Sequence, residues 1–142
     1  MIYIGNIREV MRDDYDPTFA IVRSYKGKQT WIKQLDALSP SWNLFVKYRK
    51  LLDNGEWNLE NFQKVYLPQF LREMHEPIAR DSLNTIFKMS KSGINLALVC
   101  FCQDERLCHR SIIAGLLQGA GADVRLSSGA DYSCYYKMYK GE

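Results

Sequence analysis

The sequence contains no run of apolar residues approaching the roughly 18 that a membrane-spanning helix requires. Its first residues, 1–6, lack the basic segment and the apolar stretch of a secretion signal. We therefore expect a cytoplasmic protein that does not contact membranes, in a compartment where thiols stay reduced. The four cysteines are then candidates for catalysis or metal binding rather than for disulfides.

Two common phosphate-handling motifs are also missing. The sequence has no G-x4-G-K-S/T loop, which argues against ATP hydrolysis. Seven residues separate Cys102 from Arg110, so the C-x5-R loop of cysteine phosphatases is absent. The excess of basic over acidic residues is small, 19 against 16, for a net charge of +3. This charge permits an acidic or phosphorylated partner without requiring nucleic acid.

Short β-prone runs alternate with segments of helical periodicity along the 142 residues. We expect strands at 2–4, 18–22, 95–101 and 122–126, and helices at about 40–53, 58–74, 77–92 and 108–118. This order predicts an α/β fold, namely a single three-layer, Rossmann-like domain with a small, mainly parallel sheet flanked by helices. We expect the domain to cover 1–142, with 127–142 as a tyrosine-rich C-terminal segment. This segment either packs on the surface or in an oligomer contact, or its tyrosines stack with the bases of nucleic acid.

Finer features of the helices can also be predicted. Ile7, Val10 and Met11 have helical spacing, so a short helix is expected after the first strand. Ser39 is the expected N-cap of the next helix, with Pro40 at its first position. An apolar face should follow on that helix, and a kink or break is expected at the proline in 58–74. The face consists of Trp42, Phe45, Tyr48 and Leu52.

The chemistry of the chain is concentrated between Cys100 and Ser111. An apolar strand there ends in Cys100 and Cys102, a polar loop follows, and Cys108, His109 and Arg110 begin an amphipathic helix. Backbone N–H groups at a helix N-terminus attract anions and lower the pKa of an exposed thiol. We therefore interpret this stretch as a site.

In parallel α/β sheets, ligands bind beyond the carboxyl ends of the strands. That rule brings Gly5 and Asn6, then Arg23 and Ser24, to the same edge as the 100–111 loop. A planar guanidinium binds phosphate or carboxylate in a bidentate manner, so Arg23 and Arg110 are expected to hold an anion together with Ser111. The alternative is that both arginines form structural salt bridges.

Cys108, His109 and Cys102 are the candidate catalytic residues. Cys108 could act as a nucleophile, a metal ligand or a redox partner of Cys102, and His109 could act as a general base or an anion donor. The alternatives are buried structural thiols and a histidine that fixes the loop. The spacing C-x-C-x5-C-H differs from the C-x2-C pairs of zinc ribbons, so no metal is assigned.

With these residues assembled, the chain resembles the YeaO-like proteins, a family catalogued as domain of unknown function 488. The similarity rests on strand-end motifs ending in Gly5 and in Val22-Arg23-Ser24, on Leu35-Asp-Ala-Leu38-Ser-Pro-Ser41, and on the cysteine signature. The signature is Cys100, Cys102 and Cys108-His109-Arg110, with Cys102 where many members have glutamate. The resemblance implies an α/β fold and a site at these residues, and it supplies no reaction. Relatives in phage and mobile elements suggest, by analogy, a role in nucleic-acid metabolism or defence.

The sequence leads to one principal hypothesis and two alternatives. The principal hypothesis is binding of a phosphorylated, nucleotide-like small molecule or nucleic-acid component at the carboxyl edge of the sheet, with Cys/His-assisted chemistry on it. One alternative is a sequestering or interaction protein that uses the same pocket without turnover. The other is a thiol redox or zinc module built on Cys102 and Cys108.

Overall fold

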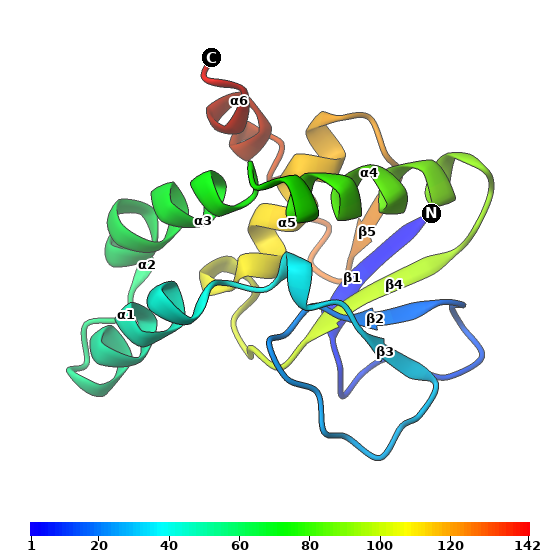
Figure 1. Cartoon of the computed structure of the whole chain (residues 1–142), viewed down its shortest axis with the longest axis horizontal. Helices are drawn as coiled ribbons and strands as arrows, with labels where there is room; N and C mark the ends of the chain where they lie inside the picture. The colour runs from blue at the N-terminus through cyan, green and yellow to red at the C-terminus, as the bar shows by residue number, and fades with distance from the viewer.

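The computed structural model describes all residues, 1–142, as an α/β domain built on a five-stranded parallel sheet (Figure 1). The strands are β1 (Ile2–Asn6), β2 (Thr18–Ala20), β3 (Ile32–Gln34), β4 (Leu96–Cys100) and β5 (Val124–Leu126), in the order β3-β2-β4-β1-β5. Every neighbouring pair is parallel, so all five carboxyl ends meet at one edge. The predicted fold class is confirmed.

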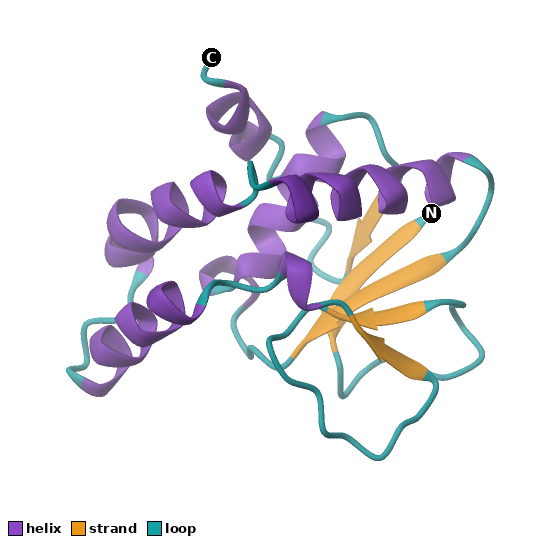
Figure 2. Cartoon of the chain, viewed as in Figure 1, coloured by secondary structure: helices purple, strands orange, loops and turns teal.

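The helices are α1 (Trp42–Asp53), α2 (Leu59–Asn61), α3 (Leu67–Glu73), α4 (Pro77–Lys91), α5 (His109–Gly119) and α6 (Cys134–Lys140). A 3-10 turn, η1 (Asp36–Leu38), precedes α1, another, η3 (Glu105–Leu107), precedes α5, and a π-helical segment, η2 (Phe62–Tyr66), joins α2 to α3. Figure 2 shows that the α1–α3 helices extend beyond the strands on one side of the sheet. No helix combines the length and the apolar character needed to cross a membrane.

The two faces of the sheet are covered differently. Ile4 and Leu98 face a core of 24 buried residues that includes side chains from α3, α4 and α5. The alternate residues Ala97 and Val99 face a smaller cluster of six, which is covered by aromatic side chains such as Tyr15 and Trp31. β4 is buried on both faces, as its continuous apolar sequence predicts. The strand that carries the site is therefore held in the centre of the sheet.

Several local predictions hold and others are wrong. Asn58 caps α2 by accepting a hydrogen bond from the N–H of Asn61 at 2.9 Å, and the predicted break appears as the π segment before Pro68. The expected helix after β1 is a series of turns. The N-cap of α1 is Ser41, not Ser39. The Ser41 hydroxyl accepts a hydrogen bond from the N–H of Leu44, whereas the Ser39 hydroxyl donates to the carbonyl of Asp36 in η1.

The C-terminal segment contains a helix that its sequence did not reveal. Helix α6 packs on α5, where Gly115 and Gly119 leave the space that Tyr132 and Tyr136 occupy. Gln118 fixes this segment by accepting from Tyr132 N at 2.8 Å and donating to Ala130 O at 3.1 Å. The tyrosines of 127–142 thus pack against the domain.

Candidate functional site

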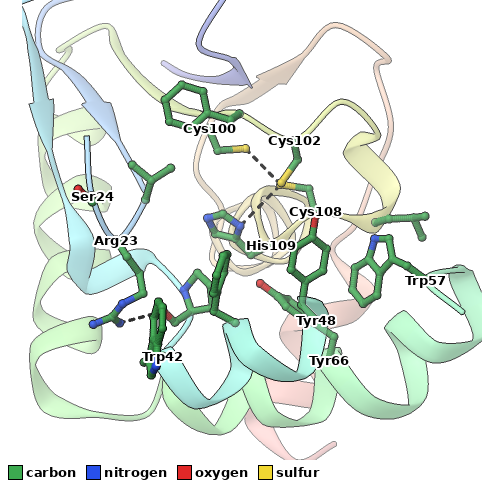
Figure 3. A pocket seen from close by; sticks show the side chains of 15 residues that line it. Arg23, Ser24, Trp42, Tyr48, Trp57, Tyr66, Cys100, Cys102, Cys108 and His109 are labelled. Atoms are coloured by element: carbon green, nitrogen blue, oxygen red, sulfur yellow. Dashed lines mark hydrogen bonds between the residues drawn. The ribbon is translucent and has the colours of Figure 1, made fainter. Parts of the chain in front are cut away.

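Three cysteine sulfurs meet at the carboxyl end of β4 (Figure 3). Cys100 is the last residue of β4, Cys102 is the second residue after the strand, and Cys108 is the N-cap of α5. Their Sγ atoms lie within 4.8 Å of one another, and those of Cys100 and Cys108 are 3.1 Å apart. All four cysteines are free, and the fourth, Cys134, lies exposed on α6. The fold therefore builds a thiol cluster, defined here as Cys100, Cys102 and Cys108.

His109 faces this cluster in a defined orientation. Its Nε2 lies 2.6 Å from Ile21 O, and a carbonyl can only accept, so Nε2 carries the proton. The Nδ1 lone pair is then directed at Cys108 Sγ, 3.6 Å away. Adjacency in sequence did not establish a contact between these side chains, but the bend of the chain into α5 produces one. His109 thus combines the predicted loop-fixing role with a position to accept a proton.

Arg110 lies behind the thiol cluster and is 5% exposed. Its Nη1 donates to Cys102 O at 2.7 Å and lies 3.4 Å from Cys100 Sγ, while its Nε has no hydrogen-bond partner. No carboxylate pairs with it, so the predicted salt bridge is absent. A buried, unpaired guanidinium is costly, which leaves a thiolate of the cluster as its nearest anionic partner.

Hydrogen bonding distributes the charge unequally among the three thiols. Bonds from the Cys102 and Cys108 thiols hold the pKa of Cys100 well below its usual value, against the effect of burial. The bond to Cys100 raises the pKa of Cys102 to about 12, and burial raises the pKa of Cys108 well above its usual value. Burial alone would lower the pKa of Arg110, but the charge of Cys100 outweighs it. The lowered pKa that the helix N-terminus would give an exposed Cys108 therefore does not arise, because this residue is 1% exposed.

A pocket of about 430 Å³ opens in front of the thiol cluster and His109. Its walls are aromatic, with Tyr48 and Trp57 in edge-to-face contact at 4.8 Å. Figure 3 shows Trp57 and Trp42 on opposite sides of the hollow, with Tyr48 and Tyr66 between them. The complete lining is Val22, Arg23, Ser24, Pro40, Trp42, Phe45, Tyr48, Trp57, Tyr66, Cys100, Phe101, Cys102, Leu107, Cys108 and His109.

The predicted ligand-binding residues separate into three groups. Arg23 and Ser24 line the pocket at its rim, where Arg23 Nη1 donates to Pro40 O at 3.0 Å and leaves its other donors free. Asn6 supports the site from behind, since its Nδ2 donates to Cys102 O at 3.0 Å. The remaining residues do not line the pocket: Gly5 is buried within β1, Ser111 donates to Cys108 O at 2.8 Å, and Arg110 lies behind the cluster. The expected pairing of Arg23 with Arg110 on one anion is therefore not seen.

The aromatic walls were not assigned to the site from the sequence. Trp42, Phe45 and Tyr48 were predicted only as part of one apolar face of the helix, but the buried residue of α1 is Leu44, and Trp42 is 65% exposed. This face of α1 looks into the pocket because α1 stands beyond the edge of the sheet. Seven aromatic residues between 42 and 70 are the feature that could have indicated it.

Comparison with known proteins identifies the family of this chain. A family model described as the active DUF488-N3 subclade matches residues 7–121. The chain belongs to this family. The match covers Arg23, the aromatic walls and the whole thiol cluster, and it ends before the tyrosine-rich segment. Searches of curated proteins and of solved structures found no significant match. The family resemblance drawn from the cysteine signature is therefore confirmed, and the function has to be argued from the site.

Proposed function

We propose that the pocket binds a phosphorylated, nucleotide-like ligand, with its planar ring among the aromatic side chains and its phosphate at Arg23 and Ser24. The observation that carries this proposal is the composition of the lining. Aromatic faces form the walls, and Arg23 is the only lysine or arginine there, with no carboxylate among the 15 residues. A volume of about 430 Å³ lies in the range of small-molecule sites.

The two parts of such a ligand match two kinds of side chain. Bases stack on aromatic faces with about 1–3 kcal/mol for each stacked base. The guanidinium of Arg23 presents further N–H donors in the planar fork that suits a phosphate. Arg110, the other predicted anion ligand, has no such role in this proposal, because it is buried behind the thiols.

The reactive side chains of the pocket lie at its floor. Cys102, Cys108 and His109 would contact the ring or the atoms next to it, and these are the groups for a Cys/His-assisted step. The description of the matching subclade as active supports a reaction at this site. The alternative is a protein that sequesters the same ligand without converting it, and it uses the same pocket.

Native mass spectrometry of the full chain, followed by titration with adenosine monophosphate, adenosine and ribose 5-phosphate, tests the proposal. We expect the nucleotide to bind more tightly than either part, because only the nucleotide uses both the aromatic walls and Arg23. Equal binding of ribose 5-phosphate and the nucleotide would contradict it. Mass analysis of the nucleotide after incubation then distinguishes an enzyme from a binder.

A further inference from the structure

We propose that Cys100, Cys102 and Cys108 bind a thiophilic divalent cation of the zinc class, with Arg110 as its buried counter-charge and one coordination position open to the pocket. The spacing of the cysteines in the sequence argued against a zinc ribbon. The fold changes that argument, since it brings the three sulfurs within 4.8 Å of one another. The inference does not depend on nucleotide binding.

The three ligands come from rigid parts of the structure. Cys100 ends a strand that is buried on both faces, and Cys108 begins α5. Cys102 lies in the turn between them, and its carbonyl accepts from Asn6 at 3.0 Å and from Arg110 at 2.7 Å. These two bonds fix the turn, so the three thiols are directed to one point before any ion arrives.

The distances between the sulfurs are close to those of a metal site. Sulfurs bound to one zinc ion at about 2.3 Å stand about 3.8 Å apart in a tetrahedron, so Cys100 and Cys108, now at 3.1 Å, would separate by about 0.7 Å. Three protein ligands leave the fourth position of the tetrahedron vacant. The cluster lines the pocket, so that position would be filled by water or by a ligand atom from the pocket.

Besides the distances between the sulfurs, the charges around the thiol cluster independently support a bound cation. Three thiolates around a divalent cation carry a net charge of −1, and Arg110 carries +1. This guanidinium is buried, has no carboxylate partner, and has an Nε without a hydrogen bond. Its Nη1 lies 3.4 Å from Cys100 Sγ. A metal–thiolate anion would give this buried cation a full counter-charge beside Cys100, where the protein places no carboxylate.

His109 completes the surroundings of the ion as a neighbour. Its Nε2 is held by Ile21 O at 2.6 Å, so the ring cannot turn, and Nδ1 stays beside Cys108 Sγ at 3.6 Å. If a metal ion bound water beside the thiols, His109 would be the neighbouring base available to that water. In this arrangement the thiols serve as ligands, and His109 is the group that would act on what the ion holds.

Cobalt titration of the reduced, chelator-treated full chain tests the inference, with Co²⁺ as the probe. We expect saturation at one ion per chain and intense sulfur-to-cobalt charge-transfer absorption, which added Zn²⁺ removes. Cys134→Ser is the matched control and should leave both unchanged, because this cysteine is exposed on α6. Cys102→Ser, which alters the least buried thiol of the cluster, should lower the affinity at least tenfold and weaken the absorption.

The counter-charge is tested separately by Arg110→Gln, with circular dichroism to show that the variant folds. We expect about a 10- to 100-fold loss of Co²⁺ affinity, as for other residues that support metal ligands. The inference is overturned if fully reduced wild-type protein, with four free thiols by titration, shows no saturable cobalt binding. It is also overturned if Cys134→Ser abolishes binding. Nucleotide binding, measured in metal-free protein, can fail or succeed independently of either result.

Discussion

Two of the hollows on this molecule are similar in size but differ in what their polar groups do. The pocket at the carboxyl edge of the sheet measures about 430 Å³, and a groove between α4, α5 and α6 measures about 490 Å³. Both contain aromatic side chains, a histidine and an arginine. We call the first the edge pocket and the second the α4–α6 groove.

In the α4–α6 groove, the aromatic and polar groups hold the C-terminal segment in place. His75 stacks on Tyr139 at 4.0 Å and its Nε2 lies 3.0 Å from Tyr139 O, while the Tyr139 hydroxyl donates to Met74 O at 2.7 Å. In the edge pocket, three thiols converge beside the hollow, and the Nδ1 of His109 lies 3.6 Å from one of them, Cys108 Sγ. Size and aromatic content therefore do not identify a site, whereas converging reactive groups do.

The largest contrast should come from the two arginines. Arg23→Ala should weaken nucleotide binding by about 1.5–3 kcal/mol, the value of a hydrogen bond to a charged group. Arg80→Ala, the matched change in the α4–α6 groove, should have no effect on that affinity. Isothermal titration calorimetry with adenosine monophosphate measures both. Because Arg23 is exposed, the melting temperature of the Arg23→Ala protein should equal that of the wild type. An equal loss of nucleotide affinity in the two variants would remove the distinction between the hollows.

A pair of aromatic substitutions should give a somewhat smaller contrast. Trp42→Ala removes a wall of the edge pocket that is 65% exposed, so folding should be little affected. We expect a loss of about 1–3 kcal/mol in nucleotide affinity if a base stacks on it. Phe87→Ala in the α4–α6 groove is the control. Adenosine should show the same loss as the nucleotide, since the phosphate is not involved; binding that is insensitive to Trp42→Ala would place the base elsewhere.

The smallest effect concerns the reactivity of the cysteines in the two regions. In metal-free, reduced protein at neutral pH, iodoacetamide should label Cys134 on α6 first, because it is exposed. Cys102 should react slowly, since its pKa of about 12 keeps it neutral, and its rate should rise about tenfold per pH unit toward that value. Peptide mapping after brief alkylation measures the order. Rapid labelling of Cys102 at neutral pH would show that the hydrogen bonds within the thiol cluster are not formed.

The parts of this protein that could be predicted from sequence are those governed by local rules. The run 96–100 is continuously apolar, so a buried strand follows, and the parallel order brings Arg23 and Cys102 to one edge. The cysteines, histidine and arginine between 100 and 111 could likewise be recognised as a candidate site. The family signature at Cys108-His109-Arg110 belongs to the same class of local pattern.

The features that were missed depend on three-dimensional packing. The face of α1 that carries Trp42 and Tyr48 has the periodicity of a core face, and only the placement of α1 beyond the sheet turns it toward a hollow. Arg110 was expected to be open to an anion, but the first turn of α5 directs it under the strand end instead. Helix α6 has few apolar residues in a regular pattern, and it is stabilised by packing against Gly115 and Gly119 of α5.

The three tryptophans allow a direct measurement of where a ligand binds. Trp42 and Trp57 line the edge pocket, whereas Trp31 packs on the opposite face of the sheet. In a two-dimensional ¹H–¹⁵N spectrum of metal-free protein titrated with adenosine monophosphate, the indole N–H signals of Trp42 and Trp57 should shift and saturate together. The signal of Trp31 should stay in place. Shifts confined to Trp31, or to backbone signals of α4 and α6 around the α4–α6 groove, would contradict a nucleotide-like ligand in the edge pocket.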